Sequence, residues 1–314
     1  MYVKSSIARS WTITKISFSV IGKDKEMLLF ALFGAIASIL YVVAIFIPSA
    51  VFLVFTNNIN YLVQGLELIG NDDLNKAASN DITEADFGFV LVEFVILFVV
   101  YVGLAFIAVF FNACVIYTTK IRLEGGDATF MESLRFGLSK IGIIFQWSII
   151  SATVGVLLFL LEKIAERVPG IGNMVVYGIR IVLGVMWSIT TLFILPVLVY
   201  EDVSPAKAIR RSNDILRKTW GESIIGHAGL GLIQFFCILA VVAVTVGMLA
   251  LNPSEIVIFW ILALAIVSLY CISLVFSVAK TVFKTALYVY ASTGKEPTAF
   301  SSELLAGAIK SKDR

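Results

Sequence analysis

The stretch YEDVSPAKAIRRSNDILRKTW, Tyr200 to Trp220, is polar, yet long apolar runs lie on both sides of it. Ser204 is a favourable N-cap, and Pro205 suits the first position of a helix. Small and apolar residues recur at helical spacing along one face: Ala208, Ile209, Ser212, Ile215, Leu216, Thr219 and Trp220. The opposite face carries the charges: Lys207, Arg210, Arg211, Asp214, Arg217 and Lys218. This pattern predicts an amphipathic helix with a basic face at a membrane surface.

The flanking runs place the chain in a membrane. Of its 314 residues, 59% are hydrophobic and 15% are charged, whereas soluble domains are about 45–50% apolar and about 25% charged. A helix needs ~20 apolar residues to cross the hydrocarbon core. Six runs reach this length: 27–55, 89–117, 141–161, 181–200, 224–251 and 256–283. We expect the first run to be an uncleaved transmembrane helix, kinked or ended near its outer end by Pro48.

The basic residues predict the orientation. Most of the 24 Lys and Arg residues lie in four segments on one side: the N-terminus, the loops after the second and fourth runs, and the C-terminal segment. The other side holds only Lys76, Lys163, Arg167 and Arg180. Because cytoplasmic segments are enriched in Lys and Arg, we predict a multi-pass protein of the inner or plasma membrane with both termini in the cytoplasm.

Three further segments share the amphipathic pattern. The first sets Ile7, Trp11, Phe18 and Ile21 on one stripe. The second begins with the capping box Thr129–Glu132 and continues with Phe130, Leu134, Leu138 and Ile141. The third, residues 298–310, contains Phe300, Leu304 and Ala308. The predicted fold is therefore a single membrane domain, 1–314: an all-α polytopic protein with six transmembrane helices in three parallel hairpin repeats (about 1–117, 118–200 and 201–290) and four amphipathic helices at the cytoplasmic face.

Three stretches carry a resemblance to known proteins. LPVLVYEDVSPAKAIRRSNDIL (195–216) resembles a pattern found in a broad group of prokaryotic polytopic proteins, which includes the membrane domain of glycerophosphoryl diester phosphodiesterases. KTALYVYASTGKEPTAF (284–300) and ARSWTITK with KDKEMLLF (8–15 and 23–30) are similar to a related uncharacterised family of integral membrane proteins. We expect no attached soluble catalytic domain like that of the phosphodiesterases, so no active-site residue carries over. The resemblance implies a six-span module of unknown activity.

Several chemistries are not expected. The net charge of +2 gives no reason to expect nucleic acid as a partner. Cys114, Cys237 and Cys271 lie inside apolar runs, and His227 is the single histidine, so we expect neither a disulfide framework nor a metal site. Ser223 lies one helical turn from His227, but no acid orients the pair, which favours helix packing over hydrolysis. We therefore expect no cofactor and no enzymatic activity.

Polar residues inside the runs suggest a path for a solute. Glu93 either changes protonation in a transport cycle or forms an interfacial pair with a base such as Arg180. The amides Asn112, Gln146 and Gln234 either bond between helices or line a pore. These residues define one hypothesis, a small-solute or ion transporter or channel.

The basic residues define the leading hypothesis. Lys280 and Lys284 lie one turn apart at the inner end of the sixth run, where they either anchor the helix or join the amphipathic helices in a lipid-headgroup site. The candidate residues for headgroups or a partner are Lys207, Arg210, Arg211, Arg217, Lys218, Lys280 and Lys284. The sequence thus favours a non-enzymatic integral membrane module that engages anionic lipids, or a membrane partner protein, at the cytoplasmic face. The repeat would also suit a homo-oligomer.

Overall fold

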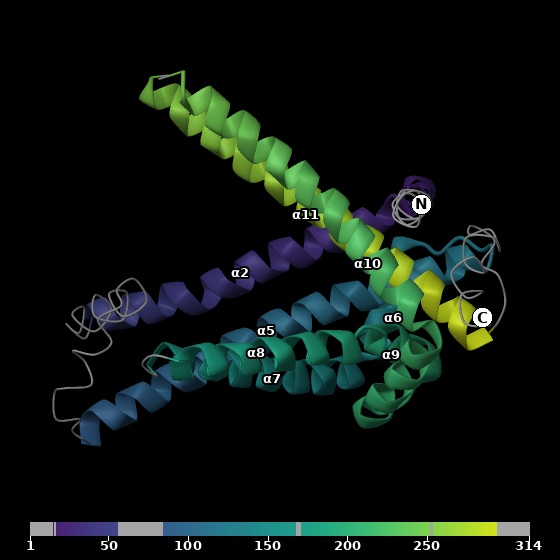
Figure 1. Ribbon diagram of the computed structural model, residues 1–314, viewed down its shortest axis with the longest axis horizontal. Helices are drawn as coiled ribbons and strands as arrows, with labels where there is room; N and C mark the ends of the chain where they lie inside the picture. Colours follow the sequence, from purple (N-terminus) through teal and green to yellow (C-terminus); the bar gives the residue numbers. More distant parts are fainter. Residues whose placement is uncertain (1–14, 16, 56–83, 168–170, 252–253, 294–314) are drawn as a thin grey trace.

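The computed structural model describes residues 15, 17–55, 84–167, 171–251 and 254–293. All regular structure in these ranges is helical (Figure 1). The principal helices are α2 (Glu26–Phe55), α5 (Glu84–Leu123), α6 (Phe130–Ser139), α7 (Ile141–Arg167), α8 (Ile171–Thr190), α9 (Ile194–Glu201), α10 (Pro205–Leu249) and α11 (Glu255–Thr293).

The predicted six spans are confirmed. Six segments of the described chain are long and apolar enough to cross a membrane: 26–48, 95–123, 141–166, 172–201, 229–249 and 255–289. Each overlaps one of the six apolar runs of the sequence. Length and composition are therefore those of a multi-pass, all-helical membrane protein.

The fourth span begins earlier than its apolar run. The run was predicted from Ile181, but α8 starts at Ile171, so that Arg180 lies within the helix and not at its head. Arg180 Nη2 donates to Glu162 Oε2 of α7 at 2.8 Å. This pair lets a charged residue stand inside an otherwise apolar helix, because each charge has its partner on the neighbouring helix.

Two expected helix ends are absent. Pro48 was predicted to kink or end the first span, and α2 does not end there but continues to Phe55. The amphipathic segment predicted before the fifth run is not a separate helix either, because α10 is continuous over 45 residues from Pro205 to Leu249. Gly221, Glu222 and Ser223 lie between the amphipathic part and the apolar part. The one glycine among them costs about 1 kcal/mol in a helix without ending it.

The second amphipathic segment forms the separate helix α6. Its predicted capping box is present: the Thr129 hydroxyl accepts from the Glu132 N–H, and Glu132 Oε2 accepts from the Thr129 N–H. The face packed on α5 carries small residues, Ser133 and Gly137, whereas Leu138 of the expected apolar stripe is exposed.

The other amphipathic segments are described only in part. Residues 17–23 are helical, while residues 1–14 and 298–310 lie outside the described chain. The threefold repeat therefore stays a prediction.

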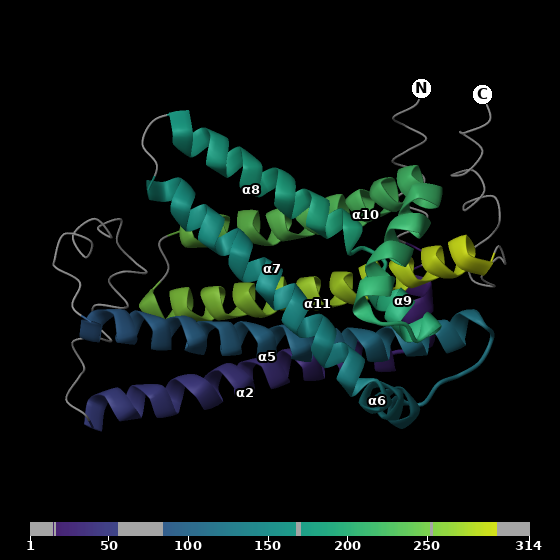
Figure 2. The same ribbon diagram turned by 90° about the horizontal axis from the view of Figure 1, so that it is seen from below.

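The helices form a closely packed body and a diverging pair. In the body, α5 packs against α2 and α7, and α7 packs against α8. α10 pairs with α11, which also contacts α5 and α2. The α10–α11 pair then leaves the body at a wide angle (Figure 1). From below, α2, α5 and α11 follow one general direction, and α7 and α8 slant across them (Figure 2).

The core lies at one end of the bundle. Its buried residues come from the start of α2 and the residues before it, the C-terminal halves of α5 and α11, the first turns of α7, most of α9, and α10 as far as Leu230. We call this the basic end, because it carries Lys120, Arg122, Lys140, Lys207 and Arg210. Beyond it the helices separate, and no residue of the apolar stretch 231–249 of α10 is buried. Such bare apolar helices require lipid around them.

Candidate functional site

The site begins with a break in the fourth span. Residues 191–193 form a turn between α8 and α9. The cause is Pro196, which has no N–H and whose ring clashes with the carbonyl four residues earlier, at Leu192. Ser212 of α10 stabilises the break: its hydroxyl donates to the Thr190 carbonyl at 2.7 Å and accepts from the Phe193 N–H at 3.2 Å.

A second network fixes α9 beside the break. Glu201, the last residue of α9, accepts from Arg211 Nε at 2.8 and 3.1 Å and from the Tyr288 hydroxyl at 2.9 Å. The hydrogen bond to Glu201 raises the pKa of Arg211 above its already high ordinary value, so Arg211 stays charged. Next to it, Asp202 has a left-handed backbone (φ 50°) and pairs with Lys140 at 2.6 Å. The network joins α9, α10 and α11 into one unit.

A polar cavity of about 200 Å³ lies against this break. Its apolar wall comes from α5 and α9 and from the turn between α8 and α9. Its polar lining consists of Asn112, Thr191, Ser277, Lys280, Thr281 and Lys284. Irregular backbone within a membrane protein is tolerated where it is buried in protein or lines a cavity, and the break at residues 191–193 meets that condition.

Hydrogen bonds order most of the polar lining. Lys280 Nζ donates to Gln234 Oε1 of α10 at 2.6 Å. The Thr281 hydroxyl lies 3.1 Å from Asn112 Oδ1 and 3.0 Å from the Ser277 carbonyl. Asn112 Nδ2 donates to the Ala108 carbonyl at 2.8 Å. The Asn112 amide thus donates to the Ala108 carbonyl, and its Oδ1 lies within hydrogen-bonding distance of the Thr281 hydroxyl.

The two lysines have no anionic partner in the described part of the chain. Lys280 bonds to a neutral amide, and no ion pair of the described residues includes Lys280 or Lys284. Both are half-buried, and they lie four residues apart on one helical face, where like charges repel. Positive charge within a membrane span is costly unless an anion or water accompanies it, so the cavity is suited to an anion.

The structure brings together residues that the sequence placed in different hypotheses. Lys280 and Lys284 were lipid candidates, whereas Asn112 and Gln234 were transport candidates. Lys280, Lys284 and Asn112 line the cavity, and Gln234 bonds to Lys280. Gln146 is exposed on α7 and lies outside the cavity lining.

The remaining candidates lie elsewhere. Lys207, Arg210 and Arg217 are exposed on the first half of α10, and no ion pair joins them to a described acidic residue. Arg211 faces Glu201. Glu93 belongs to α5 and Lys218 to α10, as do Ser223 and His227, but the side chains of these four lie outside the described part of the structure.

Sequence reasoning missed Thr191, Ser277 and Thr281 as lining residues, and Glu201 and Ser212 as the residues that fix the wall. A signal for part of the cavity was present. Ser277, Lys280, Thr281 and Lys284 stand at i, i+3, i+4 and i+7, which is a polar stripe along one face of an apolar helix.

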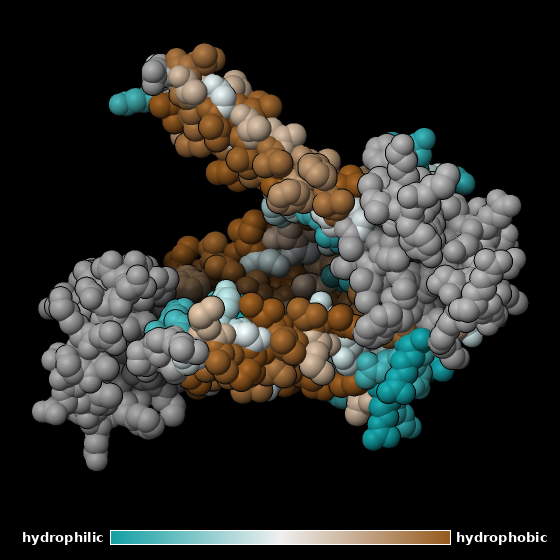
Figure 3. Space-filling view, in the orientation of Figure 1, coloured by the Kyte–Doolittle hydropathy of each residue, from teal (hydrophilic) through white to brown (hydrophobic). Residues whose placement is uncertain are grey.

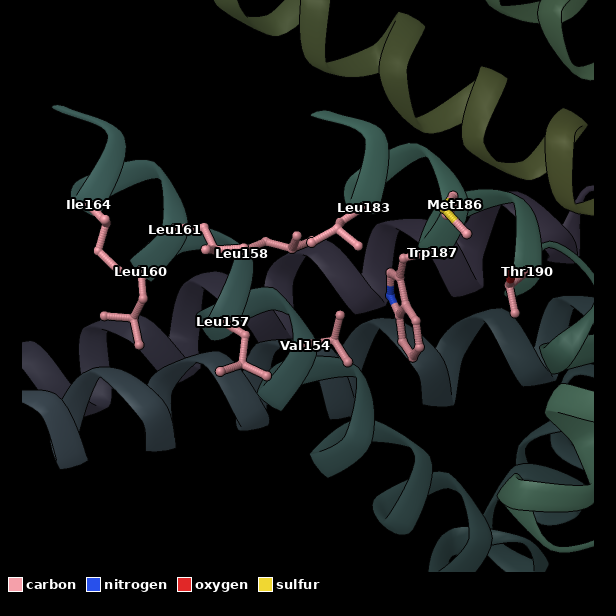
Figure 4. A pocket seen from close by; sticks show the side chains of 10 residues that line it. All are labelled: Val154, Leu157, Leu158, Leu160, Leu161, Ile164, Leu183, Met186, Trp187 and Thr190. Carbon is pink, nitrogen blue, oxygen red and sulfur yellow. The ribbon is translucent and has the colours of Figure 1, made fainter. Parts of the chain in front are cut away.

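A second hollow differs in character. An apolar groove of about 610 Å³ runs between α7 and α8, lined mainly by leucines with Met186 and Trp187 (Figure 4). It contains no charged residue and ends at Thr190. The groove offers contact to hydrocarbon but no polar group that could select a ligand.

Comparison with known proteins gives a family and no activity. No curated protein and no solved structure matches the chain significantly. The expected relation to glycerophosphoryl diester phosphodiesterases therefore has no support from these comparisons. Residues 91–298, about two thirds of the chain, match a family of unknown function, DUF6159. This match includes all the residues that line the polar cavity. The chain belongs to the family of unknown function DUF6159.

Proposed function

We propose that this protein is a non-enzymatic membrane module that engages anionic lipid headgroups at its basic end, which we take to face the cytoplasm. The observation that carries the proposal is the pair Lys280 and Lys284, which line a polar cavity without a described carboxylate beside them. Anionic lipids are the anions present at high local concentration beside such a site.

Exposed basic residues at the same end support the proposal. Lys207, Arg210 and Arg217 extend from α10 without a described acidic partner, and each such residue near an anionic surface contributes about 1 kcal/mol to attraction. Arg211 has a different role in this proposal, because its charge is paired with Glu201. It positions α9.

The test is the lipid that remains bound after gentle extraction from the native membrane. We expect the combined variant Lys207→Gln, Arg210→Gln and Arg217→Gln to retain fewer anionic lipids per chain, measured by native mass spectrometry. The matched control is Lys163→Gln, because Lys163 pairs with Glu166 on an exposed part of α7. An unchanged lipid content in the triple variant would overturn the role of the exposed basic residues.

Two other functions predict different experimental results. A membrane partner protein, or a second copy of the chain, would co-purify in fixed stoichiometry. A transporter is favoured by one observation, the helix break beside a polar cavity, which is typical of substrate sites in transporters. It predicts substrate-dependent flux in proteoliposomes that Glu93→Gln abolishes, and absence of such flux would leave the lipid module as the better account.

A further inference from the structure

We infer that the polar cavity binds the head of a single anionic phospholipid, with the phosphodiester at Lys280 and Lys284 and a hydroxyl-bearing head group beside Thr191 and Thr281. This inference rests on the proposed function and names its ligand. It follows from the charge of the cavity, its volume, its hydrogen-bonding groups and its place in the fold.

The charge of the cavity favours a phosphodiester. Lys280 uses one of its three N–H groups on Gln234, so it keeps two, and no hydrogen bond of the described chain engages Lys284. A phosphate oxygen pair can accept from both ammonium groups, and lysine is a common phosphate ligand in proteins. A zwitterionic lipid would bring its own cation next to two lysines, and like charges repel.

The volume leaves room for a head group. The cavity holds about 200 Å³, whereas about 10–15 Å³ on the same measure is enough for one water. A phosphate with a short polyol fits such a space.

The hydroxyl groups select the head further. The Thr191 hydroxyl donates to the Trp187 carbonyl at 2.8 Å, and the single proton of Thr281 is directed to Asn112 Oδ1 or the Ser277 carbonyl. Both oxygens therefore present free lone pairs to the cavity and no free proton. Acceptors of this kind pair with ligand hydroxyl groups, as in a glycerol head.

The position in the fold leaves room for the acyl chains. The cavity lies where α11 meets the residues that follow α8. From this point the α10–α11 pair and α8 diverge, and Figure 3 shows the hollow between them with mostly hydrophobic walls and hydrophilic residues at its inner end. A lipid with its head in the cavity would place its chains between these apolar walls.

The experiment uses the full chain in nanodiscs and native mass spectrometry with defined lipids. We expect one molecule of phosphatidylglycerol per chain, bound at least tenfold more tightly than phosphatidylethanolamine. The double variant Lys280→Gln and Lys284→Gln should lose about thirtyfold in affinity, at roughly fivefold per lysine. Lys280→Arg with Lys284→Arg keeps both charges and should restore most of the binding, which separates lost charge from a folding defect.

The control and the opposing outcomes separate the two proposals. The surface variant Arg210→Gln with Arg217→Gln should leave the single tight lipid in place. If the wild type shows no preference for anionic lipids, both proposals fail. If it prefers them but the lysine variant binds as well as the wild type, the cavity is not the site, although the proposed function stands. If soluble glycerol phosphate displaces the lipid at equal concentration, the site takes a free phosphate ester and not a lipid.

The head-group assignment has its own variant. Thr281→Val removes one acceptor but no charge. We expect it to weaken phosphatidylglycerol binding severalfold and to leave phosphatidic acid, which has no head-group hydroxyl, unaffected. Equal effects on both lipids would overturn the selection by hydroxyl groups.

Discussion

At the scale of single residues, Ser212 shows how one side chain maintains the wall of the cavity. The side chain is fully buried, and its hydroxyl both donates to Thr190 and accepts from Phe193. These two backbone groups stand at the helix break, where the regular ladder cannot satisfy them. A buried polar group left without a partner costs about 1–3 kcal/mol.

Ser212→Ala should therefore destabilise the protein by roughly that amount. We expect a lower midpoint of thermal unfolding in detergent. The control is Ser268→Ala, because Ser268 bonds only to the Leu264 carbonyl of its own helix. In that variant the Leu264 carbonyl still accepts a hydrogen bond from the helix backbone. Equal midpoints for the two variants would show that the break does not depend on Ser212.

Asp24 gives a residue-scale prediction about pH. Its side chain is 3% exposed and lies 3.4 Å from Arg122 Nη2. Burial raises the pKa of Asp24 above its ordinary value of 3.8, although the charge of Arg122 lowers it in part. The folded state therefore holds the proton more tightly than the unfolded state. The stabilising contribution is complete below the ordinary pKa and is lost as the pH rises through the raised pKa.

The comparison is between the wild type and Asp24→Asn across that pH range. The unfolding midpoint of the wild type, relative to that of the variant, should be highest in acid and should fall as the pH rises from about 4. Asp24→Asn cannot titrate at this position. The difference between the two unfolding midpoints therefore removes the contributions of the other titratable groups, which both proteins share. A relative midpoint that rises with pH would mean that the ion pair with Arg122 outweighs burial.

At the scale of elements, hydropathy could predict the six spans because crossing a membrane fixes both length and composition. The capping box of α6 could be predicted because it depends on residues three apart. The break before α9 could not be placed as readily. Pro48 and Pro196 both lie within apolar runs, yet α2 continues through the first, while the second follows a break stabilised by Ser212 from another helix. Such a partner, distant in sequence, is not visible in local pattern.

The same limit applies to the cavity. The stripe Ser277, Lys280, Thr281 and Lys284 could be read from the sequence, but its neighbours lie far along the chain: Asn112 in α5, and Thr191 in the turn after α8. The pairing of Arg211 with Glu201 likewise required the fold, since the sequence alone assigned Arg211 to the basic surface.

The pairing of Arg211 with Glu201 should stabilise α9 against unfolding. Glu201→Gln should lower the unfolding midpoint clearly, because Glu201 accepts from both Arg211 and Tyr288, and hydrogen bonds to charged groups contribute about 1.5–3 kcal/mol before allowance for partial exposure. Asp202→Asn is the matched control. Its carboxylate is 65% exposed beside Lys140, and exposed pairs contribute about 0–1 kcal/mol.

A double-mutant cycle completes this test. Once Glu201 is neutral, Arg211→Gln should cost much less than it does in the wild type, because the two residues share one interaction. Additive effects of the two substitutions would contradict the network.

At the scale of the whole molecule, the protein is compactly packed at the basic end and open beyond it. The burial of α2, α5, α9, α10 and α11 is concentrated there, while the remaining helix lengths expose apolar side chains. Lipid therefore completes the structure of the diverging part. The basic residues gather at the packed end, so the distribution of charge and the distribution of packing coincide.

This coincidence makes the orientation a testable property of the whole chain. Lys and Arg are retained on the cytoplasmic side of membranes, so the basic end and both termini should face the cytoplasm. A fluorescent protein fused after Arg314 should fluoresce, and alkaline phosphatase fused there should be inactive. The same two reporters inserted between α7 and α8 should give the opposite pattern, because α7 ends and α8 begins at the other end of the bundle (Figure 1). An active C-terminal phosphatase would reverse the topology, and it would also move the lysine cavity to the outer leaflet, away from the anionic surface of the cytoplasmic leaflet.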